Sequence, residues 1–128
     1  MTNKEIYLGA LALIGEPDEY GAADYAERAP FILANFISEN AALDNQYRRA
    51  HGKKALSDDL VIFASPDDAF PLSSRFAAAA EQYLAAMLLE EEDTDRSDLF
   101  FDRYCKAMTA ILAEIPAVRE KIMNSYGV

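Results

Sequence analysis

Several residue types that carry chemistry in small proteins are nearly absent from this chain. Among its 128 residues the sequence has one cysteine, Cys105, and one histidine, His51. A single cysteine excludes a disulfide within the chain, and Cys/His spacings typical of zinc sites are missing. No apolar run reaches the roughly 18 residues of a membrane-spanning helix. With only 5 glycines and 5 prolines, the composition also argues against a collagen or a mainly disordered chain.

Positive charge is scarce as well. The chain has 12 lysines and arginines against 22 aspartates and glutamates, a formal net charge of −10. Such a surface repels phosphate groups, which disfavours adsorption to free DNA or to an anionic membrane, whereas a basic protein partner is easier to accommodate. We therefore expect a cytoplasmic protein without membrane contact.

What the sequence does contain is apolar content at helical spacing, 52% of all residues. The first helix is predicted to begin at a capping box, residues 2–5 (TNKE), and to end at Gly15 and Pro17. A second helical pattern runs from about residue 22 to residue 50. Pro30 lies inside this pattern, so we expect either a kink or a break at which Pro30 restarts the helix.

A long connection, Lys53 to Pro71, separates the second helix from the third. Residues 60–64 are β-branched and aromatic, which predicts a short extended segment. Long loops are often functional, so this segment is a candidate arm that reaches a neighbouring subunit. The contact residues predicted here are Leu60, Val61, Ile62 and Phe63.

The third helix is rich in alanine and ends in four acids. Its core stripe is Phe76, Ala80, Tyr83, Leu84, Met87 and Leu88, with Ser73 or Ser74 as the cap. The other alanines are explained either by helix propensity alone or by a central helix that its own domain and a neighbouring subunit both contact. The predicted subunit contacts are Ala77, Ala78 and Ala85.

The acidic cluster has three interpretations. It consists of Glu90, Glu91, Glu92 and Asp93. Asp93 can cap the next helix, the four acids can form a contact patch, or Glu90 and Asp93 can share a metal ion, although no second acidic pair at metal-ligand spacing occurs.

A fourth helix, from about residue 95 to residue 115, forms a hairpin with the third, and Pro116 precedes a last helical piece. One domain, residues 1–128, folded as an all-α, up-and-down bundle of four to five helices, is the expected architecture.

Catalytic motifs are missing, so we expect no enzyme and no cofactor. His51 has no carboxylate at a fixed offset and is predicted to be an exposed residue at a helix end. A basic segment surrounds it, with Arg48, Arg49, Lys53 and Lys54. These cations can remain solvated, bind a partner's acids or DNA, or meet the acidic cluster of the next copy in a ring.

Three stretches together resemble a known family. They are ALALIGE, YAERAPFILANFISE, and FPLSSRFAAAAEQYLAAMLLEEEDTDRSDLFFDRYCKAM. The sequence is similar in these stretches to the head-to-tail connector, or adaptor, proteins of tailed bacteriophages and prophages. The resemblance implies a helical structural subunit that forms a ring on the portal, contacts tail-completion proteins, and lets DNA pass as cargo. It places the protein in the bacterial host cytoplasm during assembly and then in the virion, with residues 117–128 in the portal-gripping role.

Two alternatives remain open. A helical metal-dependent nucleotide hydrolase would need Glu90, Glu91 and Asp93 to face Glu27 or Glu39 across a pocket. A regulatory protein-binding module would instead use the basic segment as its contact surface.

Overall fold

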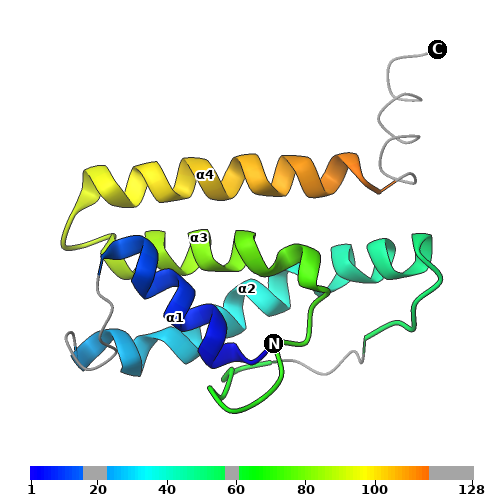
Figure 1. Cartoon of the computed structure of the whole chain (residues 1–128), viewed down its shortest axis with the longest axis horizontal. Helices are drawn as coiled ribbons and strands as arrows, with labels where there is room; N and C mark the ends of the chain where they lie inside the picture. Colours follow the sequence, from blue (N-terminus) through cyan, green and yellow to red (C-terminus); the bar gives the residue numbers. More distant parts are fainter. Residues whose placement is uncertain (16–22, 57–60, 116–128) are drawn as a thin grey trace.

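The protein is all-α, as its sequence predicts. The computed structural model describes residues 1–15, 23–56 and 61–115. In them it contains four α-helices, a short 3-10 helix and no strand; the elements are α1 (Asn3–Ile14), α2 (Ala23–Ala50), η1 (Ser74–Phe76), α3 (Ala77–Leu89) and α4 (Thr94–Ala113). Helices α3 and α4 form an antiparallel hairpin, and α1 and α2 pack on α3 (Figure 1). None of the helices in these ranges is long and apolar enough to cross a membrane.

Local interactions at both ends determine the boundaries of helix α1. The Thr2 hydroxyl accepts a hydrogen bond from the Glu5 backbone N–H at 3.2 Å, and the Glu5 carboxylate accepts one from the Thr2 N–H at 3.3 Å. At the other end, Gly15 adopts the left-handed conformation with φ 90°, which glycine reaches without steric cost. The predicted capping box is confirmed, while Pro17 lies outside the described residues.

Of the two outcomes expected at Pro30, a kink or a break, the structure excludes the break. Helix α2 continues through this residue for 28 residues in all. Proline removes one hydrogen bond from a helix, but packing supplies most of a helix's stability in a protein. Pro30 itself is buried, and its carbonyl accepts a hydrogen bond from the Ala64 N–H at 3.0 Å.

Helix α3 lies in the middle of the bundle, in contact with α1, α2 and α4. Its alanine methyl groups fill the space between the helices, and Ala79, Ala80, Ala85 and Ala86 are at most 1% exposed. Small side chains allow close approach of helix axes, which explains the alanine content of α3. The expected contact of α3 with several elements of its own domain is confirmed.

Residues 61–73 return along the chain's own surface. The Val61 carbonyl accepts a hydrogen bond from the Ser38 hydroxyl at 3.0 Å, and the Asp68 carbonyl accepts one from the Asn3 N–H at 2.9 Å. Residues 61–64 lie against α2 and form no strand, while Ile62 and Phe63 remain exposed, so the expected contact of this segment with a neighbouring subunit stays a prediction. The β-branched and aromatic residues have no neighbouring strand with which to pair in the described part of the chain. Leu60 lies outside the described residues.

The predicted serine cap of the third helix is also wrong. Ser73 precedes η1 without a capping bond from its side chain, and Ser74 lies inside η1. Instead, the Ser73 backbone N–H donates to the Asp44 carboxylate at 3.1 Å, which ties the segment before α3 to α2. The predicted last helical piece after Pro116 lies outside the described residues.

Candidate functional site

The basic segment lies at the C-terminal end of α2. Arg49, Lys53 and Lys54 are exposed there. Arg48 is only partly exposed, and its guanidinium donates to the Asp44 carboxylate at 2.8 Å and to the Pro71 carbonyl at 2.9 Å. The charge of Arg48 is therefore largely compensated within the chain, and its predicted contact with a partner stays a prediction. His51 is exposed, as expected, and stacks on the Tyr47 ring.

The acidic cluster forms the turn between α3 and α4. Asp93 caps α4, because its carboxylate accepts a hydrogen bond from the Arg96 N–H at 3.2 Å. The Tyr25 hydroxyl donates to the Glu92 carboxylate. Glu90 and Glu91 are exposed. The capping interpretation is confirmed for Asp93, which leaves Glu90 and Glu91 as the acids most accessible to a partner.

The two charged clusters lie at opposite ends of the long axis. In Figure 1 the end of α2 lies on the right and the α3–α4 turn on the left. We define the basic end as Arg49, Lys53 and Lys54, and the acidic end as Glu90, Glu91 and Glu92. The Glu114 carboxylate at the C-terminal end of α4 accepts two 2.7 Å hydrogen bonds from Arg75, and this pairing lowers the pKa of Glu114. That acid is therefore neutralised by its own chain.

Apolar side chains are exposed along α2 and α4. Phe31 is 56% exposed, Ile62 70% and Phe63 50%, and the Phe31 and Phe63 rings pack edge to face at 5.2 Å between centroids. Val61 is half-buried. We call Phe31, Ile62 and Phe63 the α2 patch. The sequence predicted Ile62 and Phe63 as exposed contacts but missed Phe31, because an apolar residue in an amphipathic helix is usually assigned to the core.

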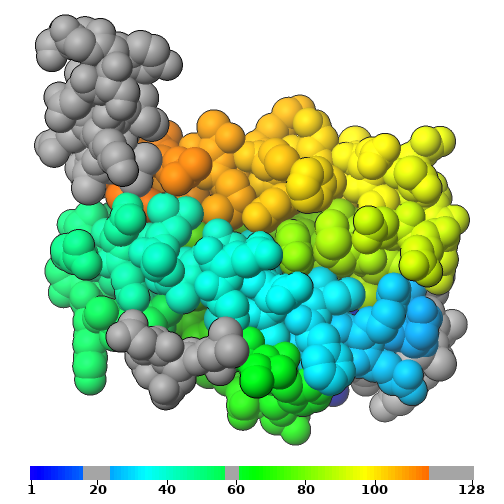
Figure 2. All heavy atoms as spheres, turned by 180° about the vertical axis from the view of Figure 1, so that it is seen from behind, coloured from blue at the N-terminus to red at the C-terminus, as the bar shows by residue number. Residues whose placement is uncertain are grey.

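On α4, a second apolar stripe flanks the buried one. It comprises Phe101, Cys105, Met108 and Leu112, which recur at helical spacing, and all but the half-buried Met108 are exposed. Figure 2 shows the face on which α2 is outermost, with α4 along its upper edge. We call these residues the α4 stripe.

The three alanines predicted as subunit contacts differ in how far they are buried. Ala78 is exposed and Ala77 is half-buried. Ala85 is fully buried in its own core, with an exposed fraction of 0%. The prediction of Ala85 as a subunit contact is therefore wrong, because the chain's own helices already cover it.

An open hollow between α2 and α3 brings together two of the acids that a hydrolase would need. Its volume is about 550 Å³, and its lining includes Glu27 and Glu90 with Phe31, Tyr83 and Met87. Burial raises the pKa of the Tyr83 phenol. Glu91 and Asp93 do not line this hollow, and no group of three metal-ligating side chains occurs in the described ranges. Two carboxylates alone make a poor Mg²⁺ site.

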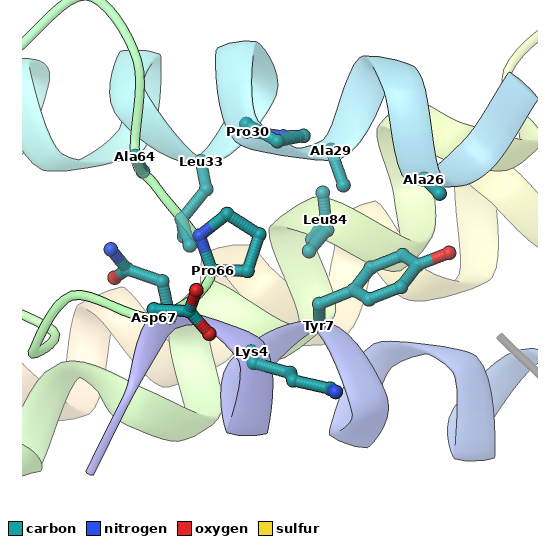
Figure 3. A pocket seen from close by; sticks show the side chains of 11 residues that line it. Lys4, Tyr7, Ala26, Ala29, Pro30, Leu33, Ala64, Pro66, Asp67 and Leu84 are labelled. Carbon is teal, nitrogen blue, oxygen red and sulfur yellow. The ribbon is translucent and has the colours of Figure 1, made fainter.

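A smaller cavity lies between α1, α2 and the turn at residues 64–67. Its volume is about 270 Å³. Leu33, Leu84 and Pro66 line it together with the ring of Tyr7, and Lys4 runs beneath that ring (Figure 3). Nothing in the sequence pattern predicted this cavity, because its walls come from α1, α2, α3 and the turn at residues 64–67, which are distant along the chain.

Three comparisons with known proteins found no match. No protein-family model, no curated protein and no solved structure matches this chain.

Proposed function

We propose that this chain is a structural assembly protein whose copies associate head to tail. The basic end of one copy would contact the acidic end of the next. The observation that carries this proposal is the position of the two clusters at opposite ends of the long axis (Figure 1). Two different patches on one subunit give a heterologous contact, which forms a ring when the rotation closes and a filament when it does not.

Charge alone would make this contact weak. Exposed ion pairs contribute about 0–1 kcal/mol each, and they mainly select orientation and speed association. The exposed apolar residues of the α2 patch and the α4 stripe offer further area that a neighbouring copy or a larger partner can bury. We assign orientation to the charged ends and affinity to these apolar surfaces.

The assembly we favour is the head-to-tail connector of a tailed phage or prophage. The portal and tail-completion proteins would be the partners, with assembly in the bacterial host cytoplasm and the final position in the virion. Three features support this proposal beside the sequence resemblance: the all-α hairpin with its acidic turn, the exposed apolar surfaces, and the net charge of −10. A negative surface lets DNA pass as cargo without binding it tightly.

Charge reversal at one end at a time tests the head-to-tail contact. The variant K53E/K54E makes both ends acidic, and the variant E90K/E91K makes both ends basic. Light scattering and electron microscopy would measure assembly of each protein, alone and with the portal protein encoded in the same genome. We expect each variant alone to lose assembly, and an equimolar mixture of the two to recover it, because acidic and basic ends then alternate.

A matched control makes the same change in net charge at a position away from both ends. K106E/R103E on α4 is the control for K53E/K54E, and these control residues are exposed. It should assemble as the original protein does. The proposal is wrong if the original protein stays monomeric with and without the portal protein, or if the two variants fail to complement each other.

A further inference from the structure

The open hollow between α2 and α3 has an apolar floor. Its volume is about 550 Å³, and Phe31 and Ile32 of α2 line it together with Tyr83 and Met87 of α3. Phe31 is 56% exposed, so solvent reaches this floor. Figure 2 shows α3 between α2 and α4 on the face where α2 is outermost. An exposed apolar hollow of this size is suited to bind a group from another molecule.

The rim of the hollow is acidic. Glu27 on α2 and Glu90 at the end of α3 line it, and neither takes part in an ion pair within residues 1–15, 23–56 and 61–115. Arg28 also lines the hollow, but its own chain holds its guanidinium. This group donates to the Leu88 carbonyl at 2.9 Å and lies 3.5 Å from the Asp24 carboxylate. The two glutamates can therefore attract a cation from another molecule.

The Tyr83 ring lies within this negative field. Burial raises the pKa of the Tyr83 phenol, and the charges of Glu39 and Glu90 raise it further. A field that disfavours a phenolate favours a cation at the same place. The ring packs edge to face on Tyr104 at 5.2 Å between centroids, which holds it in position. A cation in the hollow is thus attracted by the aromatic ring as well as by the carboxylates.

A lysine side chain matches both the floor and the rim. Its four-carbon stem is apolar and its end is charged, so the stem can cover the floor while the ammonium group stays at the rim. Lys53 and Lys54 of the basic end are exposed. They lie at the opposite end of the long axis from Glu90 (Figure 1), so they reach the hollow only on another copy.

We propose that the hollow is the site at which the basic end of the next copy inserts Lys53 and Lys54. Their ammonium groups pair with Glu27 and Glu90, and their stems lie against Tyr83. This inference rests on the proposed head-to-tail contact and names the binding site on the receiving copy. Glu27 lies outside the acidic end, so it distinguishes insertion into the hollow from a general attraction between charged ends.

Two variants that each keep one half of the contact test the site on the full chain. K53E/K54E loses the lysines but keeps the hollow. Asn35→Trp fills the hollow from an exposed position of its lining but keeps the basic end. A mixture can form one contact and cannot extend it, so we expect a one-to-one pair in light scattering. NMR of isotope-labelled K53E/K54E should show shifts at Tyr83 and Met87 when the unlabelled Asn35→Trp protein is added.

Changes in the labelled protein measure what the hollow contributes. E27Q/E90Q keeps the shape of the rim and should raise the dissociation constant of the pair about tenfold, because two ion pairs are lost. D95N/D98N removes the same charge from exposed positions of α4 outside the hollow, and screening should keep its effect below about twofold. Adding Asn35→Trp to the labelled protein should abolish the pair, whereas Ala110→Trp, at an exposed position of α4, should not.

The outcomes separate this inference from the proposed function. If the pair forms but E27Q/E90Q binds as tightly as D95N/D98N, or if the pair persists when both proteins carry Asn35→Trp, the charged ends meet outside the hollow. Only the present inference is then overturned. If K53E/K54E and Asn35→Trp form no pair at all, the head-to-tail contact itself is overturned together with it.

Discussion

Gly9 and Glu81 meet between α1 and α3, and their contact can be tested by a single added methyl group. A Cβ atom on Gly9 would lie 2.5 Å from Glu81 Oε1 and 2.6 Å from its Cδ. These distances are far inside van der Waals contact, so one of the two groups must move. Only the far end of the flexible Glu81 side chain lies within 3 Å, so Gly9→Ala requires rotation of Glu81 rather than separation of the helices.

The expected effect is a gain in stability. Alanine is more favourable than glycine inside a helix by about 0.8–1 kcal/mol. An off-rotamer Glu81 would cost about 0.5–1.5 kcal/mol, but rotation toward water avoids most of that cost. Burial raises the pKa of Glu81 above its usual 4.5, so the carboxylate also regains hydration when it moves outward. We expect Gly9→Ala to stabilise the protein by about 0.5–1 kcal/mol at pH 7.

Urea unfolding of four proteins measures this prediction: the original chain, Gly9→Ala, Glu81→Ala and the double variant. Because the pKa of Glu81 is raised on folding, this group makes stability fall as pH rises from 4.5 through the raised value. Either single variant should reduce that fall. Ala12→Gly, at an exposed position of α1, calibrates the helix propensity. The reasoning is refuted if Gly9→Ala destabilises by more than about 1 kcal/mol even in the Glu81→Ala background, because the two backbones would then be in conflict.

Four further variants test the interactions that position the proposed surfaces. Asp44→Ala should cost about 3 kcal/mol in urea unfolding, because the buried carboxylate accepts hydrogen bonds from a guanidinium and a backbone N–H. Ala85→Leu should cost about 1–3 kcal/mol by overpacking, whereas Ala78→Leu on the exposed side should stay within about 0.5 kcal/mol. Arg75→Ala should destabilise the protein near pH 7. Because the pairing lowers the pKa of Glu114 below 4.5, the difference from the original chain should shrink as pH falls through that lowered value.

Features that depend on neighbouring residues could be predicted from the sequence. The capping box at Thr2 and Glu5 and the cap at Asp93 each involve residues three positions apart. Helix α2 was predicted almost to its ends because its apolar spacing is regular. Local chemistry left open a break at Pro30, and α2 continues there because tertiary packing supplies most of a helix's stability in a protein.

The candidate sites required contacts that no local pattern contains. Arg48 looks like Arg49 in the sequence, yet only Arg48 reaches the Asp44 carboxylate and the Pro71 carbonyl. The cavity likewise depends on where the turn at residues 64–67 lies against α1 and α2. The sequence predicted that each charged cluster lies at the end of a helix. That the two clusters lie at opposite ends of the molecule depends on how α2 and α3 are oriented in space.

The burial of α3 changes where an assembly contact can lie. An alanine-rich helix suggested a surface for other subunits, but Ala79, Ala80, Ala85 and Ala86 are covered by helices of the same chain. The small methyl groups therefore allow close packing within the bundle, and further copies cannot use them without unfolding it. The proposed association would instead use side chains that remain exposed. Ile62 and Phe63 on one side and the α4 stripe on another are apolar, and the two charged ends distinguish one direction along the molecule from the other.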